Sequence, residues 1–265
     1  MTAGAIVGVC IVRYSPLPLL ANISLAFAFS SLCLMISRTT LIPLISACML
    51  PVLLKTESWV YPAAVFIMSG IIIYGQKLME QKEIRKEIAF TPQEINWKQD
   101  SLKWLVLLIS LVFITAIPVY TLYIYCILPP LIVTYVEFAR SKAGFRNRPV
   151  QILLLLISSA TIGASFQWFI HCYLGLPESV VACLAFICLF CIFEWMGKFF
   201  APAGAIALIP MIIPKEDLLW FPLQVTIGAT VFISVAMLLF LQCYKWSKAQ
   251  LIYSLTPSFI LNRRK

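Results

Sequence analysis

The sequence predicts an all-α fold, a polytopic transmembrane helical bundle. Of its 265 residues, 62% are hydrophobic and 12% are charged, whereas a soluble domain averages about 45–50% apolar and about 25% charged residues. Long apolar stretches recur, and several approach the roughly 20 residues that a helix needs to cross a bilayer. The composition excludes intrinsic disorder, which requires low hydrophobicity. The 9 cysteines are too sparse for a disulfide scaffold.

Apolar segments bounded by Pro, Gly and charged residues are the expected elements, and ten of them occur, at 2–13, 17–36, 40–54, 59–76, 102–117, 119–137, 150–172, 177–194, 199–213 and 219–243. Three segments are short. Segment 2–13 is about half a span, and segments 40–54 and 199–213 each contain two prolines. Because Pro removes a backbone donor, we expect these last two to be crossing but broken helices.

One long polar stretch runs from 76 to 103. We expect the helix of the fourth segment to continue into water through Lys82, Arg85 and Lys86. Thr91-Pro92-Gln93-Glu94 is then typical of a helix start, with Thr91 as the cap and Pro92 at the first helical position. The stretch is predicted to be a helical hairpin outside the bilayer that links two halves of the chain.

The basic residues predict the topology. If all ten segments cross and the N-terminus lies inside, 17 of the 20 Lys and Arg residues fall on the inner side, as the positive-inside rule requires. If segments 40–54 and 199–213 were re-entrant, the basic polar stretch at 77–103 would lie outside the cell. The positive-inside rule disfavours this arrangement. We expect an integral protein of a bacterial cytoplasmic membrane with both termini in the cytoplasm. The net charge of +9 therefore indicates no nucleic-acid partner.

The chain matches itself at an offset of 159 residues. Thr2-Ala-Gly4-Ala5 pairs with Thr161-Ile-Gly163-Ala164, Pro43 pairs with Pro202, and Pro51 pairs with Pro210. Six apolar segments separate equivalent points. Because six is even, we expect two parallel pseudo-repeats with the same orientation, as in parallel-repeat transporters.

The predicted organisation has four parts: a first repeat of four segments at 1–76, a cytoplasmic polar helical linker at 77–101, a second repeat of six segments at 102–243, and a basic cytoplasmic tail at 244–265. The first repeat lacks counterparts of two opening segments. We expect either an N-terminally truncated or mis-started form of a twelve-segment protein or a partner that supplies the missing segments.

The stretch Phe200-Ala-Pro-Ala-Gly-Ala-Ile-Ala-Leu-Ile209 resembles the signature of the HPP family of integral membrane proteins, named for a His-Pro-Pro motif followed by Ala-Gly-Ala. Trp220-Phe-Pro222 and Gly228-Ala229 resemble the family's closing helix. Here Phe200 occupies the His position and Ala201 that of the first Pro. Some members are linked with nitrite transport, so the resemblance implies a permease-like protein for a small solute, with a small anion such as nitrite as a candidate.

Broken helices at matching positions of two halves predict a solute site. Freed backbone groups and small residues allow a solute to approach at mid-depth. The predicted substrate-binding residues are Pro202, Ala203, Gly204, Pro210, Pro43, Pro51, Thr161 and Gly163. Two alternatives stay open: tight helix packing through small residues and, for Thr161, a bond back to its own helix.

Three further residues are singled out. Glu194 and Lys198 lie four apart near a predicted inner face and form a candidate gate if the helix continues through both; a snorkelling surface pair is the alternative. His171, the only His, lies at a predicted outer end, where an interfacial role is favoured over a proton relay or ligand.

Enzymatic functions are disfavoured. One His excludes multi-His metal sites, and neither paired intramembrane carboxylates nor a phosphate-binding Gly loop stands out. We therefore expect no metal and no cofactor. The leading hypothesis is a secondary transporter or channel-like permease, and the alternative is a non-transporting structural subunit of a membrane complex. The expected partners are the lipid bilayer, a small solute, and either a second copy of the chain or the missing N-terminal segment.

Overall fold

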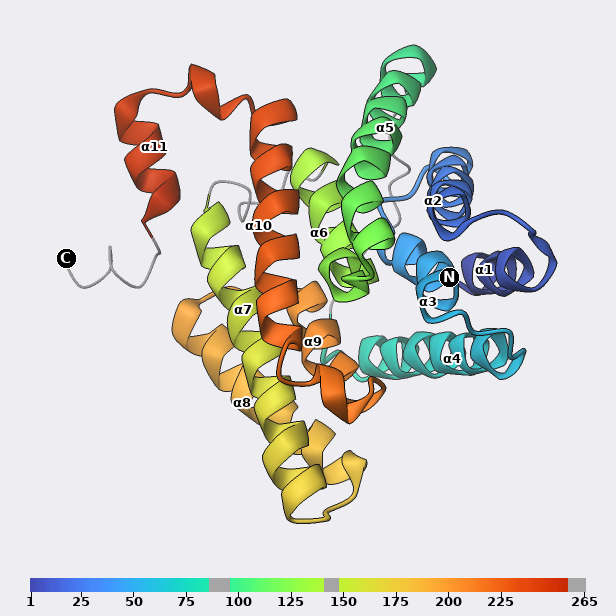
Figure 1. The fold of residues 1–265 in the computed structure, drawn as a ribbon, viewed down its shortest axis with the longest axis vertical. Coiled ribbons are helices and arrows are strands. Elements are labelled where there is room, and N and C mark those ends of the chain that lie inside the picture. Colours follow the sequence, from blue (N-terminus) through green and yellow to red (C-terminus); the bar gives the residue numbers. More distant parts are fainter. Residues whose placement is uncertain (86–95, 141–147, 257–265) are drawn as a thin grey trace. The chain divides into compact units, whose positions relative to one another are not determined.

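A computed structural model describes residues 1–85, 96–140 and 148–256. Over these residues the regular secondary structure is entirely helical (Figure 1), which confirms the all-α prediction. The chain forms two compact units, Met1–Thr121 and Leu122–Lys265.

The first unit is built around a short central helix. Its helices are α1 (Thr2–Tyr14), α2 (Leu19–Ile36), α3 (Pro43–Leu54), α4 (Val60–Gln81) and α5 (Trp97–Thr121). Helix α3 packs against both α1 and α2, α4 packs against α1, and α5 packs against α2. Eight of the 12 residues of α3 are buried, so this helix forms the core of the unit.

The second unit is built around α7. Its α-helices are α6 (Pro129–Arg140), α7 (Pro149–Phe166), α8 (Glu178–Met196), α9 (Ala201–Leu208), α10 (Phe221–Leu239) and α11 (Lys248–Leu255). Shorter elements are the 3-10 helices η1 (Ile124–Ile127), η4 (Ile209–Met211), η5 (Lys215–Asp217) and η6 (Cys243–Lys245), and the π-helix η3 (Gln167–Tyr173). Helix α7 contacts α8, α9, α10 and α11 (Figure 1).

Six helices in the described part of the chain are long and apolar enough to cross a membrane: α2, α4, α5, α7 with η3, α8 and α10. Many of their large apolar side chains are exposed, including Phe66, Ile72 and Tyr74 on α4. Such surface is unfavourable in water but suits hydrocarbon. These helices are those of an integral membrane protein.

The three segments predicted to be short are short helices. Helices α1 and α3 have 13 and 12 residues, and α9 with η4 runs from Ala201 to Met211. At about 1.5 Å per residue, α3 extends roughly 18 Å, whereas the hydrocarbon core is about 30 Å thick. Neither Pro-rich helix therefore covers the full core by itself, and their crossing stays a prediction.

The sixth predicted segment, 119–137, is not one helix. Helix α5 continues through Pro118 to Thr121, and Leu122 then adopts a left-handed conformation with φ +64°. The chain restarts as η1, and Pro129 and Pro130 open α6. Prolines fit the first helical turn because its amide donors have no partner within the helix. The break thus falls at Leu122, and not at Pro118 as the sequence suggested.

The end of α4 also differs from the expectation. Helix α4 ends at Gln81, Lys82 caps it, and Glu83 turns the chain with φ +55°. The helix thus extends past the apolar segment as far as Gln81, but not through Lys82 and Arg85 as predicted. Lys86 and the predicted helix start at Thr91 to Glu94 lie outside the described residues.

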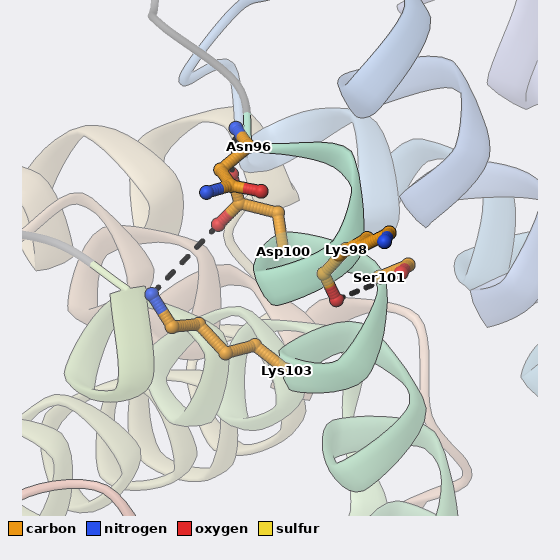
Figure 2. Close-up of polar contacts among 5 residues, drawn as sticks. All are labelled: Asn96, Lys98, Asp100, Ser101 and Lys103. Carbon is orange, nitrogen blue, oxygen red and sulfur yellow. Dashed lines mark hydrogen bonds and ion pairs between the residues drawn. The ribbon is translucent and has the colours of Figure 1, made fainter.

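Polar contacts at the start of α5 are shown in Figure 2. The backbone N–H of Asn96 donates to Asp100 Oδ2 at 3.2 Å, and Lys103 Nζ lies 3.8 Å from Asp100 Oδ1. A carboxylate in the first turn also interacts favourably with the helix dipole. Asp100 therefore stabilises the beginning of a helix that starts at Trp97, inside the predicted linker.

Helix α5 packs in the first unit, although the sequence placed 102–117 in the second repeat. Trp104 is buried and meets Phe27 of α2 edge-on, with ring centroids 5.8 Å apart. The unit boundary at Thr121 thus differs from the predicted repeat boundary at 102. The repeat boundary stays a prediction, because packing does not report where a duplication began.

One polar contact joins distant parts of the second unit. The hydroxyl of Tyr125 in η1 donates to Asp217 Oδ2 of η5 at 2.8 Å, and its ring packs edge-on against Phe221. Burial and this hydrogen bond both raise the pKa of Tyr125 above its ordinary value. The phenol therefore stays neutral and acts as a donor across the physiological range.

Replacing Tyr125 with Phe tests this contact. The change removes a hydrogen bond to a partly exposed carboxylate, so we expect the free energy of unfolding to fall by about 1 kcal/mol. Chemical denaturation in detergent measures it. Tyr120→Phe is the control, because Tyr120 is 79% exposed. Equal effects of the two substitutions would contradict a role for the Asp217 contact.

Candidate functional site

The crossing of α7 and α9 contains several predicted site residues. Gly163 is buried, and a Cβ placed on it would overlap the carbonyl oxygen of Ala207 and lie 2.9 Å from that carbonyl carbon. The two helix backbones are therefore in contact. Only Gly permits this approach, which is typical of small-residue helix packing in membranes.

The predicted residues on α9 are buried but have different local roles. Pro202 lies in the first turn of α9, where its missing donor costs no helical hydrogen bond. Ala203 is fully buried. A Cβ on Gly204 would meet only the Phe186 ring edge, at 3.4 Å, which is ordinary contact. The close backbone approach therefore depends on Gly163 and not on Gly204.

Pro210 marks a break in the helix. Helix α9 ends at Leu208 and continues as the 3-10 turn η4, in which Pro210 is buried. Within the second unit η4 packs against α7. Irregular backbone at membrane depth is tolerated where protein buries it or where it lines a water-filled cavity. The predicted break is thus present at Pro210.

A second irregularity follows α7 directly. The helix changes to a π-helix at Gln167, whose side chain is 5% exposed and whose Oε1 has no hydrogen-bond partner. Gln167 lies four residues after Gly163, at the start of η3, and η3 packs against α8. Sequence reasoning missed this residue; the only available signal was an amide inside an apolar segment.

Thr161 does not face this contact. It is exposed, and its hydroxyl donates to the carbonyl oxygen of Ile157 at 2.8 Å. This geometry matches the alternative interpretation, a Thr bonded to its own helix.

The first unit contains a similar crossing of α1 and α3. A Cβ on Gly8 would overlap the carbonyl oxygen of Cys48 and lie 2.9 Å from Pro51 Cγ, and one on Gly4 would lie 3.1 Å from the carbonyl oxygen of Leu44. Pro43, at the start of α3, is half-buried, and Pro51 is buried inside the helix, which continues through it to Leu54. The predicted break in segment 40–54 is therefore wrong, because α3 accommodates Pro51 without ending there. The sequence analysis missed Gly8, although Gly4 and Gly8 form the Gly-x-x-x-Gly pattern of close helix pairs.

The candidate gate residues lie on either side of a helix end. Helix α8 ends at Met196, and Gly197 adopts φ +60°. Its N–H donates to the carbonyl of Glu194, and the N–H of Lys198 donates to that of Phe193, which is a Schellman motif. The helix therefore does not continue through Lys198, and the condition for a helical pair with Glu194 is not met.

Lys198 instead belongs to a cationic end of the second unit. Arg148, at the start of α7, donates from Nη2 to the Tyr253 hydroxyl at 2.8 Å, and its guanidinium lies 4.7 Å from the Tyr253 ring centroid. The hydrogen bond from Arg148, with a smaller contribution from Lys198, lowers the pKa of Tyr253. These contacts attach α11 to the end of α7.

The structure thus gathers the predicted residues into two sets, one in each unit. The first set is Pro43 and Pro51, with Gly4 and Gly8. The second is Gly163, Pro202, Ala203, Gly204 and Pro210 with Gln167. Each set consists of a short helix held against a neighbour by a glycine contact, and the second set adds an unpartnered acceptor.

A substitution at Gly163 tests the crossing. Gly163→Ala would force α7 and α9 apart, so we expect a loss of about 1–3 kcal/mol in unfolding free energy. Thermal unfolding in detergent measures the change. Gly70→Ala is the matched control, because nothing lies within 4 Å of a Cβ at Gly70; it should be neutral or slightly stabilising. A neutral Gly163→Ala would contradict the backbone contact.

Comparison of the chain with protein-family models, with curated proteins and with solved structures found no match. The resemblance to the HPP family therefore stays a prediction. The fold and the two crossings are the findings on which a function is inferred.

Proposed function

We propose that this integral membrane protein is a permease for a small solute, a secondary transporter or a channel. The observation that carries the proposal is the pair of irregularities in the second unit: the change to 3-10 geometry at η4 and the change to π geometry at Gln167. Helix breaks of this kind free backbone groups for binding a solute at mid-depth. The resemblance to the HPP family makes nitrite one solute to test.

The helix bounds support two tandem repeats. Shifted by 159 residues, α2 (Leu19–Ile36) would cover 178–195, and α8 is Glu178–Met196. Shifted likewise, α3 (Pro43–Leu54) would cover 202–213, and α9 with η4 covers Ala201–Met211. The packing partners correspond as well, because α1 contacts α2 and α3 while α7 contacts α8 and α9.

Two parallel repeats give both halves the same orientation, and the distribution of basic residues favours placing both termini on the inner side. Both termini lie in the cytoplasm, and the membrane is the cytoplasmic membrane of a bacterium.

One observation favours the alternative, a structural subunit without transport activity. The contact of Gly163 with Ala207 leaves no space between the two backbones, as expected of helices that only pack. A flux assay separates the two functions.

Uptake into proteoliposomes tests the permease. We expect flux of at least one solute among nitrite, chloride, methylammonium and urea. Pro210→Ala should lower the initial rate about tenfold, because an added N–H lets α9 continue as a regular helix across the break. The control is Pro214→Ala, at an exposed residue outside α9.

Two results would count against the proposal. Flux no greater than in empty liposomes for the whole panel would favour the structural subunit. Flux that Pro210→Ala leaves unchanged would place the pathway away from η4.

A further inference from the structure

Two cations of the second unit lie together at the end where α7 begins and α8 ends. Gln151, in the first turn of α7, donates from Nε2 to the carbonyl oxygen of Met196, the last residue of α8, at 2.7 Å. Arg148 immediately precedes α7, and Lys198 follows α8 by two residues. Arg148 donates to the Tyr253 hydroxyl, and Lys198 lies close enough to contribute to the lowered pKa of that phenol. The guanidinium and the ammonium are therefore gathered around Tyr253.

The protein leaves this positive charge uncompensated. Within the part of the chain that the structure describes, neither Arg148 nor Lys198 forms an ion pair with a carboxylate. The stretch 141–147, which precedes Arg148 in the sequence, contains no Asp or Glu. The Arg148 guanidinium makes one hydrogen bond to the described residues, that to Tyr253, and its Nη1 is buried without an acceptor. An anion is the group that this end of the unit favours.

The helix lengths place the two cations at a membrane surface. Helix α7 with η3 has 25 residues and α8 has 19, and both are apolar enough to cross a membrane. At about 1.5 Å per residue they extend roughly 37 Å and 28 Å, which is close to the thickness of a hydrocarbon core of about 30 Å. Arg148 and Lys198 lie just beyond the ends of these helices, at the level of lipid headgroups. The basic residues favour this side as the cytoplasmic one, where anionic lipids give the membrane a negative surface potential.

An exposed aromatic surface leads from Lys198 along α8. Phe199, the next residue, is 69% exposed, and its ring lies 6.3 Å from that of Phe190 and 5.1 Å from that of Phe193. Phe199 therefore folds back along α8, and the apolar surface continues from Lys198 to Phe190, which is 54% exposed. The acyl chains of a lipid would bury this surface, whereas a free phosphate ion would leave it uncovered.

We propose that Arg148, Lys198 and Tyr253 bind the phosphate of an anionic phospholipid whose acyl chains lie along Phe199 and Phe190. A guanidinium donates directed hydrogen bonds to phosphate oxygens, and an ammonium adds a compact positive charge. The Tyr253 hydroxyl accepts from Arg148 and donates its own proton to the phosphate. Because Tyr253 belongs to α11, the lipid also attaches α11 to the ends of α7 and α8. This site does not depend on the proposed permease function.

Lipid-dependent unfolding tests the site. The purified protein in detergent is heated with phosphatidylglycerol or with phosphatidylcholine, at equal concentrations and with the same acyl chains. Both lipids carry a phosphate, but the choline cation offsets the charge of the second. We expect phosphatidylglycerol at about ten times its dissociation constant to raise the melting temperature by about 4 °C relative to phosphatidylcholine. Glycerol phosphate, which lacks acyl chains, should give no shift at the same concentration.

Charge variants localise the effect. Arg148→Gln and Lys198→Gln each remove one cation, and each should reduce the difference between the two lipids to less than half. Because this difference is measured within one variant, the stability of the variant itself does not enter. The matched control is Lys215→Gln, which removes the same charge from an exposed lysine at the start of η5 and should keep the full difference. If Arg148→Gln does not fold, Lys198→Gln decides, because Lys198 is half-exposed and lies outside the helices.

Four outcomes would overturn the site. An equal shift with both lipids would show that no anionic headgroup is preferred, and a difference retained by the folded charge variants would place the lipid elsewhere. An equal loss in Lys215→Gln would reveal only an effect of overall charge. A shift of the same size with glycerol phosphate would show that the acyl chains are not part of the ligand. None of these results depends on flux in proteoliposomes, so the site and the permease stand or fall separately.

Discussion

The contact between Gly163 of α7 and the backbone of Ala207 in α9 is the constraint on which the second unit depends. In a bilayer, lipid tails are as apolar as the side chains, so helices associate through close packing and hydrogen bonds and not through the hydrophobic effect. A short helix such as α9 has few side chains with which to do this. The direct backbone contact between Gly163 and Ala207 sets the position of α9 along the axis of α7. It thereby also positions η4, which packs against α7.

A similar close contact occurs in the first unit, where Gly4 and Gly8 of α1 lie against the backbone of α3. A rigid crossing can support either function, a pathway or a passive subunit. What distinguishes the second unit is the polar content next to its crossing. Gln167 is buried with an unpartnered acceptor one turn beyond Gly163, and a helix that only packs gains nothing from such a group.

Sequence reasoning predicted the apolar helices well, because each needs only a run of apolar residues. It also located the short helices and the break at Pro210, since Pro and Gly act locally. The segment boundaries placed the break between α5 and α6 at Pro118, whereas the chain breaks at Leu122, which adopts a left-handed conformation. No local sequence pattern predicts that conformation for a residue other than Gly. It assigned close approach to Gly204 and overlooked Gly8, because which glycine meets a backbone depends on the partner helix. Gln167 could not be found without knowing its burial.

The central claim, two copies of one unit in the same orientation, is tested most directly by cysteine labelling in cells. Leu17 and Leu176 are equivalent positions at the offset of 159 and are 50% and 41% exposed. Each is changed to Cys in a variant lacking the native cysteines and treated with a membrane-impermeant maleimide. The account predicts that both label from outside intact cells, while Thr40→Cys and Phe199→Cys label only after permeabilisation. Labelling of Leu17→Cys and Leu176→Cys from opposite sides would contradict it.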